Sequence, residues 1–108
     1  MAYTATFWGT RGSIPTPGAH TARYGGNTSC VAVQGTGGQL VILDAGTGIR
    51  ALGATLVQNG SVQADILLSH THWDHIQGLP YFKPFFSSGS SVRITSSRTR
   101  AAACTSGV

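Results

Sequence analysis

The sequence holds 108 residues, of which 41% are hydrophobic and 9% are charged, and its formal net charge is +4. This length allows one domain or part of one, and the apolar content argues against a solvated, disordered chain. The positive balance reflects a shortage of acids, since Asp44, Asp65 and Asp74 are the only carboxylates, and it is compatible with anionic substrates.

Three strands and one long loop are expected in the first part of the chain. Residues 3–8 alternate and are rich in β-forming side chains, which predicts a strand. Residues 9–26 hold two prolines and repeated glycines, which predicts a long loop of the kind that is often functional. Residues 29–34 predict a second strand. Residues 39–43 are a nearly continuous apolar run, which predicts a third strand buried on both faces.

A helix and a fourth strand are expected next. Apolar residues at helical spacing predict a helix over residues 49–57. Residues 64–68 predict a strand, and residues 69–75 form the loop beyond its carboxyl end. Functional sites in layered α/β proteins lie outside the carboxyl ends of strands, and Asp44 also follows a strand at such an end.

The last part of the chain differs in composition from the rest. Residues 76–86 are expected to start as a helix that breaks before the segment ends. Residues 87–91 resemble a flexible Ser/Gly linker, and residues 92–95 are compatible with one more short strand. We therefore expect part of a domain over residues 1–86 and a divergent Ser/Arg/Ala-rich tail over residues 87–108.

No segment has the sequence properties of a membrane anchor or a secretion signal. No apolar run approaches the roughly 20 residues that a membrane-spanning helix needs. The start of the chain lacks a basic region followed by an apolar core. Cys30 and Cys104 match no Cys-x-x-Cys metal pattern, which favours two free thiols in a reducing compartment. We expect a cytoplasmic protein without a membrane partner.

Three of the four histidines and one aspartate lie within six consecutive residues of the sequence. They are His70, His72, Asp74 and His75. Imidazole nitrogens and carboxylate oxygens are zinc ligands. Residues two apart in an extended segment point the same way, so His70 and His72 can converge on one cation. Asp74 and His75 can converge on a second cation if the chain turns into a helix near His75. A water that bridges two such metals ionises near neutral pH and becomes a nucleophile.

Four segments of the sequence, residues 70–75, 7–15, 23–30 and 43–50, resemble one protein family. The His-x-His-x-Asp-His pattern after a buried strand is similar to the first metal motif of the metallo-β-lactamase superfamily. The other three segments resemble its ribonuclease Z-like and phosphodiesterase-like branch. The resemblance covers roughly residues 3–86.

The resemblance implies the amino-terminal half of an αββα sandwich, an α/β (α+β) fold of mostly strands with one or two helices. It implies two Zn²⁺ ions per complete site and hydrolysis of phosphodiester or related ester bonds. The substrate would be a phosphate ester or related small molecule or a nucleotide. His70 and His72 match the ligands of the first metal, and Asp74 and His75 match those of the second. Asp74 also matches the residue that orients the nucleophilic water.

Other residues are candidates for supporting roles. Asp44 matches a family aspartate that lies behind the loop of residues 69–75, which we call the metal loop. There it would accept hydrogen bonds from loop amides or from a ligand imidazole. The alternative is that Asp44 only caps the turn after its strand. Arg11, Ser13 and Asn27 lie in glycine-rich loops expected to approach the site, and the Arg11 guanidinium suits a substrate phosphate. Loop-stabilising hydrogen bonds are the alternative for these three. Trp73 is expected to pack within the metal loop.

The family completes its site with later ligands, but no histidine follows His75 and no aspartate follows Asp74. We therefore expect an amino-terminal fragment with a partial metal site and little hydrolysis of its own. A half-sandwich also leaves one sheet face uncovered, which favours self-association or a homo-oligomer. The residues expected on that face include Val41, Leu43, Ile66 and Leu68.

Three other functions remain open from the sequence. One is a different hydrolase of the same superfamily, acting on a thioester or a lactam. Another is a non-catalytic metal-binding remnant, or a half-domain that needs a partner chain. The third is a small basic nucleic-acid binder, although the sequence has no basic stripe interleaved with aromatic residues.

Overall fold

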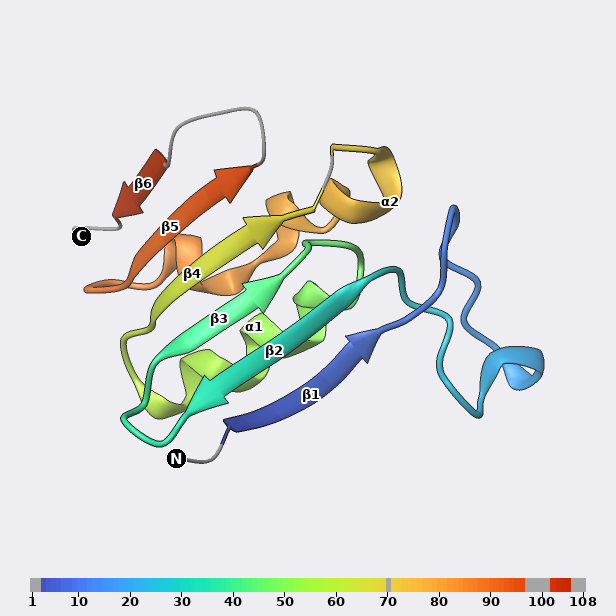
Figure 1. Cartoon of the computed structure of the whole chain (residues 1–108), viewed down its shortest axis with the longest axis horizontal. Coiled ribbons are helices and arrows are strands. Elements are labelled where there is room, and N and C mark those ends of the chain that lie inside the picture. The colour runs from blue at the N-terminus through green and yellow to red at the C-terminus, as the bar shows by residue number, and fades with distance from the viewer. Residues whose placement is uncertain (1–2, 70, 97–101, 106–108) are drawn as a thin grey trace.

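A six-stranded mixed sheet forms the centre of the molecule, with the strands in chain order across it (Figure 1). The structure, a computed structural model, describes residues 3–69, 71–96 and 102–105. The central strands β3, β4 and β5 are parallel, and the pairs β1–β2, β2–β3 and β5–β6 are antiparallel. The strands are β1 (Tyr3–Gly9), β2 (Cys30–Gly35), β3 (Leu40–Leu43), β4 (Gln63–Leu68), β5 (Ser91–Ser96) and β6 (Ala102–Thr105).

Short helices fill the connections between the strands. The α-helices are α1 (Ile49–Leu56) and α2 (Trp73–Ile76). The 3₁₀ helices are η1 (Ala19–Thr21), η2 (Val57–Asn59), η3 (Leu79–Tyr81) and η4 (Lys83–Phe86). No helix in the described part of the chain is both long and apolar enough to cross a membrane.

Most of the expected elements are confirmed, with small differences at their ends. The four strands expected before residue 69 correspond to β1–β4, and the helix expected over residues 49–57 corresponds to α1 followed by η2. The short strand expected over residues 92–95 is β5, which pairs with β4 inside the same sheet. The expectation of an α/β fold with mostly strands and few helices is therefore confirmed.

The prediction of a helix that starts at residue 76 is wrong. Helix α2 begins earlier, at Trp73, and it ends at Ile76. The following residues form η3 and η4, and each has a proline in its first two positions. Proline lacks the backbone N–H that a continuing α-helix needs, so the chain forms two short 3₁₀ turns.

The prediction of a flexible linker over residues 87–91 is also wrong. Ser90 is buried, and its hydroxyl accepts a hydrogen bond from the backbone N–H of Val62 at 2.8 Å. The backbone N–H of Ser91 donates to the Val62 carbonyl at 2.8 Å. These bonds fix the segment beside the start of β4, so that it delivers β5 directly into the sheet.

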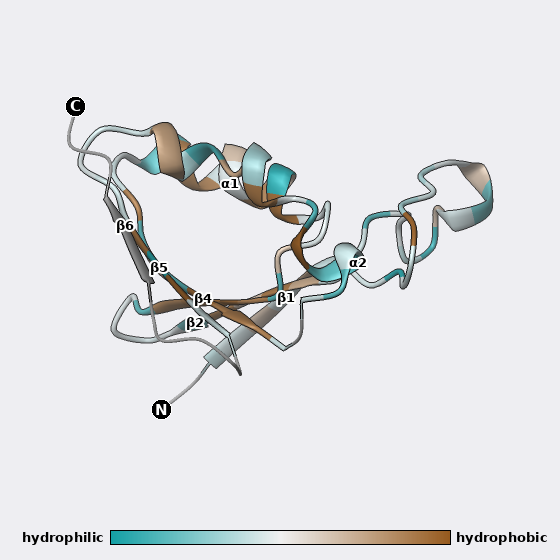
Figure 2. Ribbon diagram, turned by 90° about the horizontal axis from the view of Figure 1, so that it is seen from above, coloured by the Kyte–Doolittle hydropathy of each residue, from teal (hydrophilic) through white to brown (hydrophobic). Residues whose placement is uncertain are grey.

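The hydrophobic core lies between one face of the sheet and the layer formed by α1, η3 and η4 (Figure 2). Alternate residues of β4 face this layer, and Ile66 is fully buried. Ile49 and Leu52 of α1 meet them because residues three apart share a helix face. Complete burial of such a side chain stabilises the fold by roughly 1.5–3 kcal/mol.

The opposite face of the sheet is not covered by any described helix (Figure 2). Leu43 and Leu67, which pair in register, are 37% and 42% exposed there. The prediction that Ile66 and Leu68 lie on this face is wrong, because the alternation of β4 directs both toward α1. The prediction that residues 39–43 are buried on both faces is wrong for the same reason, since Leu40 and Ile42 are buried but Leu43 is exposed.

We propose that two copies of the chain associate through this uncovered face. Paired residues form an apolar row across four strands, namely Phe7, Val31, Leu43 and Leu67. Strands about 4.8 Å apart with a rise of about 3.3 Å per residue give the face an area of roughly 450 Å². A pair of copies would then bury about 900 Å², an area that corresponds to a weak association.

Leu67→Lys should weaken this association about tenfold or more, because a charged side chain would replace an apolar one inside the contact. Sedimentation velocity over a range of protein concentrations measures the effect. Ala54→Lys is the matched control, since Ala54 is exposed on α1 on the other side of the sheet, and it should associate like the parent chain. A parent chain that stays monomeric at all concentrations would refute the proposal.

Candidate metal centre

The neighbouring ends of β3 and β4 bring Asp44 and the metal loop together. Leu43 pairs with Leu67 in parallel register, and the Asp44 N–H donates to the Leu67 carbonyl at 2.8 Å. Parallel neighbouring strands end at the same edge of a sheet. The residues that follow the two strands therefore meet, although they are far apart in the sequence.

Asp44 is 7% exposed and has a φ of 66°, which is left-handed backbone that few residues other than glycine adopt. Its Oδ1 accepts hydrogen bonds from the Ser69 N–H at 2.8 Å and from the Ser69 hydroxyl at 2.9 Å. The same hydroxyl lies 2.8 Å from Oδ2. The carboxylate thus holds the first residue of the metal loop in place.

His75 lies between two carboxylates. Its Nδ1 is 3.0 Å from Asp44 Oδ2, and its Nε2 is 3.4 Å from Asp74 Oδ2. A carboxylate beside one ring nitrogen fixes the ring and raises the basicity of the other nitrogen, an arrangement common for histidines that bind metals. Nε2 of His75 and Oδ2 of Asp74 therefore lie close to one another, and both atom types suit zinc.

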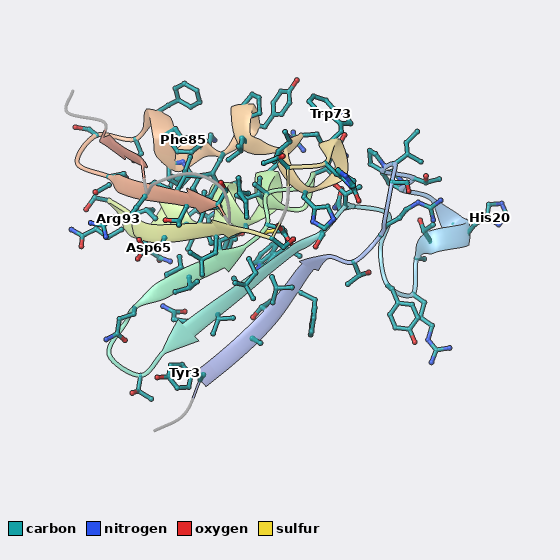
Figure 3. The ribbon with its side chains drawn as sticks, turned by 45° about the horizontal axis from the view of Figure 1, so that its top comes forward. Tyr3, His20, Asp65, Trp73, Phe85 and Arg93 are labelled. Carbon is teal, nitrogen blue, oxygen red and sulfur yellow. The ribbon has the colours of Figure 1, made fainter. Side chains whose placement is uncertain are left out.

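Helix α2 supplies the turn that brings Asp74 and His75 together. His72 is its extended N-cap residue, and the His75 N–H donates to the His72 carbonyl at 2.9 Å. The expected packing of Trp73 within the loop is wrong, because Trp73 is 68% exposed and projects outward from α2 (Figure 3).

His70 lies outside the described residues. Among the residues that the structure does describe, no group of three or more His, Cys, Asp or Glu side chains is arranged to hold a metal ion. The donors brought face to face there are Asp74 and His75, and His72 stands at the start of the same short helix. Their chemistry fits zinc, but these contacts alone do not make a full coordination shell.

The turn after Asp44 packs against α2 at very short range. The Ala45 N–H donates to the His75 carbonyl at 2.8 Å, and the Gly78 N–H donates to the Ala45 carbonyl at 2.9 Å. A Cβ atom added at Gly46 would lie 2.6 Å from the Asp74 carbonyl oxygen. Only glycine fits at this position, so the close approach holds the metal loop against the sheet edge.

The long loop between β1 and β2 reaches the same site through Ser13. Ser13 has a φ of 73°, and its backbone N–H donates to Asp74 Oδ2 at 3.1 Å. Asn27 anchors the loop: its carbonyl accepts the Arg11 N–H at 3.0 Å, and its side chain accepts the Thr47 hydroxyl at 3.2 Å. The Arg11 guanidinium donates from Nε to the Ile14 carbonyl at 2.8 Å.

A network of polar side chains that the sequence did not suggest ties these segments together. The Thr28 N–H donates to the Thr47 hydroxyl at 2.9 Å, and the Thr47 N–H donates to the Thr28 hydroxyl at 2.8 Å. The Gln77 side-chain amide donates to the same Thr28 hydroxyl at 3.2 Å. The segment before β2, the segment before α1 and the end of α2 are therefore linked behind the metal loop.

Comparison with known families decides which proteins share this arrangement. The family model described as the metallo-beta-lactamase superfamily matches residues 23–87, which include β2, β3, α1, β4 and the metal loop. The chain belongs to the metallo-beta-lactamase superfamily. No curated protein and no solved structure matches it. The resemblance is thus confirmed at the level of this superfamily of metal-dependent hydrolases.

The Cys30 thiol of this superfamily member is buried and stays protonated at neutral pH. Burial, together with the nearby Asp44 carboxylate, raises the pKa of its thiol from 9.0 to about 12. Metals and electrophiles react with the thiolate rather than the thiol. A raised pKa means that the protonated form predominates in the folded state up to about pH 12.

We expect Cys30 to react with a disulfide reagent at pH 8 at least about a hundredfold more slowly than an unfolded thiol, because burial and the raised pKa both oppose attack. The measurement uses the Cys104→Ser chain, in which Cys30 is the remaining cysteine, before and after addition of urea. Equal rates in the two conditions would show that the thiol is accessible and ionised in the folded protein.

Proposed function

We propose that this chain carries one half of a binuclear zinc site of a hydrolase that cleaves phosphodiester or related ester bonds. The observation that carries the proposal is the position of His75, with Asp44 at one ring nitrogen and Asp74 at the other. A carboxylate at one ring nitrogen and a second oxygen donor beside the other is an arrangement common for histidines that bind metals. Membership of a superfamily of metal-dependent hydrolases supports the same reading.

Each residue of the site has a distinct role in this proposal. His70 and His72 would bind the first zinc ion, and Asp74 and His75 the second. The metal pair supplies positive charge and a water molecule of lowered pKa. Asp44 holds the His75 ring, and the Ser13 N–H holds the Asp74 carboxylate that orients the water.

The phosphodiester specificity is the finer part of the proposal. It is supported by the segments 7–15, 23–30 and 43–50, whose sequence is similar to the ribonuclease Z-like and phosphodiesterase-like branch. It is also supported by the arginines of the loop beside the site, since guanidinium groups match phosphate geometry.

A second candidate function is a metal-binding half-domain that acts with a partner chain. It is favoured by the small number of donors at the site, since Asp74 and His75 are the pair that the described contacts bring together. It is favoured further by the apolar sheet face that the described residues leave uncovered. Both candidates need zinc binding, but only the first needs the chain itself to turn over substrate.

We expect the chain with added zinc to hydrolyse bis(p-nitrophenyl) phosphate slowly, within about tenfold of zinc alone, because two ligands per metal leave the site incomplete. Its acceleration over zinc alone should exceed the acceleration for chromogenic thioester and β-lactam substrates, and it should be lost in His72→Ala. A preference for the thioester or the lactam would overturn the phosphodiester proposal. Rapid turnover lost in His72→Ala would instead overturn the expectation of low activity.

A further inference from the structure

Two adjoining hollows lie in the long loop between β1 and β2. The first has a volume of about 250 Å³, and the second has a volume of about 430 Å³. The loop extends beyond the edge of the sheet where the metal loop lies (Figure 1). The hollows share Thr10, Arg23 and Tyr24. A ligand can therefore occupy both at once.

The first hollow is lined by two arginines and a histidine. Arg11, His20 and Arg23 contribute to it together with the hydroxyl of Thr21. The hydrogen bond from Arg11 Nε to the Ile14 carbonyl fixes that guanidinium in place. No carboxylate of the chain lines the hollow. The charges of Arg11 and Arg23 are therefore not neutralised there, and they attract an anionic ligand.

The carboxylates of the chain lie elsewhere. Asp44 and Asp74 belong to the metal centre. Asp65 lies beside Arg93, with 3.9 Å between Oδ1 and Nε, and Figure 3 shows this pair far from His20. The arginines of the loop therefore have no competing acidic partner among the described residues.

The second hollow is lined by aromatic rings. Phe7 and Tyr24 contribute to it, and they are 69% and 72% exposed. The guanidinium carbon of Arg23 lies 5.2 Å from the centre of the Tyr24 ring. Exposed aromatic rings beside arginine form the surface on which bases of single-stranded nucleic acids stack.

Folding brings the arginines and the aromatic rings of the two hollows together from positions that are distant in the sequence. The Thr10 hydroxyl donates to the Tyr24 carbonyl at 3.3 Å, and the Arg11 N–H donates to the Asn27 carbonyl at 3.0 Å. These bonds bring the two sides of the loop together, with Arg11 on one side and Arg23 on the other. The basic and aromatic residues that are not interleaved along the sequence thus lie together in space.

We propose that this loop binds a nucleotide unit, with its phosphate against Arg11, His20 and Arg23 and its base on the ring of Tyr24. This inference rests on the proposed function, for which it names a nucleotide substrate. The Ser13 N–H bond to Asp74 joins the same loop to the metal centre. The proposed nucleotide site and the metal centre are therefore linked through this one loop.

The test is titration of the full chain, without added metal, with a single-stranded uridine trinucleotide. Arg23→Gln and Tyr24→Ala should each weaken binding about fivefold or more, and Tyr24→Phe, which keeps the ring, should bind like the parent chain. The matched control is Arg50→Gln, since Arg50 is exposed at the start of α1 and lines neither hollow. It should leave the affinity unchanged.

Equal losses in Arg23→Gln and Arg50→Gln would overturn the site, because they would indicate general attraction to a basic protein. Unchanged binding in Tyr24→Ala would also overturn it. His72→Ala separates this inference from the proposed function, since it should lower the zinc affinity about a hundredfold and leave trinucleotide binding intact. Trinucleotide binding without zinc binding by the parent chain would contradict only the proposed function.

Discussion

His72→Ala should lower the zinc affinity of the chain about a hundredfold. The substitution removes an imidazole from a site that offers few protein ligands, so each remaining ligand carries a large share of the binding. Competition with a chromogenic chelator at pH 7.5 measures the change.

His20→Ala is the matched control for this substitution. His20 is the one histidine of the sequence outside the metal loop, and it lies at the far end of the β1–β2 loop in Figure 3. Its replacement should leave the zinc affinity unchanged. If both variants bound zinc like the parent chain, the metal loop would not be a metal site.

Asp44→Ala should lower the free energy of unfolding by about 2–4 kcal/mol. It leaves the Ser69 N–H and hydroxyl without their acceptor, and it places alanine at a φ of 66°, which asparagine and aspartate tolerate far better. It should also lower the zinc affinity about tenfold or more, because the His75 ring loses its support. Urea unfolding and chelator competition measure the two effects.

Asp44→Asn separates the two roles of this carboxylate. Asparagine tolerates the left-handed backbone and keeps one oxygen that can accept the Ser69 N–H, so it should cost roughly half the stability lost in Asp44→Ala. It should still weaken zinc binding, because a neutral amide beside His75 Nδ1 does not raise the basicity of the ring. Parent-like zinc affinity in Asp44→Asn would argue that Asp44 acts only as a turn cap.

The fold was predictable wherever one strand or helix could be assigned from its own residues. The alternation and apolar runs of β1–β4 and the helical spacing of α1 are local properties. It was harder to predict which face of the sheet each apolar residue occupies. Ile66 and Leu43 are equally apolar, but Ile66 lies on the face that α1 covers and Leu43 lies on the uncovered face. Residues 76–86 were misassigned because two prolines outweigh their apolar content.

The candidate ligands could be chosen from the sequence, and they stay a prediction; the contacts that support them could not be foreseen. The spacing of His72, Asp74 and His75 is visible in the sequence, and α2 provides the turn that this spacing needs. The role of Ser69 follows from the parallel pairing of β3 with β4, which no local pattern reveals. The Thr28–Thr47 pair is likewise separated by 19 residues, so only the folded chain brings it together.

Strand β1 gives the molecule an unequal distribution of local stability. It is an edge strand that pairs with β2 alone, and its side chains from Tyr3 to Phe7 are exposed. Segments with few buried contacts open at low free-energy cost while the core stays folded. Opening of β1 would withdraw Ser13 and the hollows of its loop while leaving Asp44 and His75 on the central strands. Substrate capture and metal retention would then be lost separately, in that order, as the protein is destabilised.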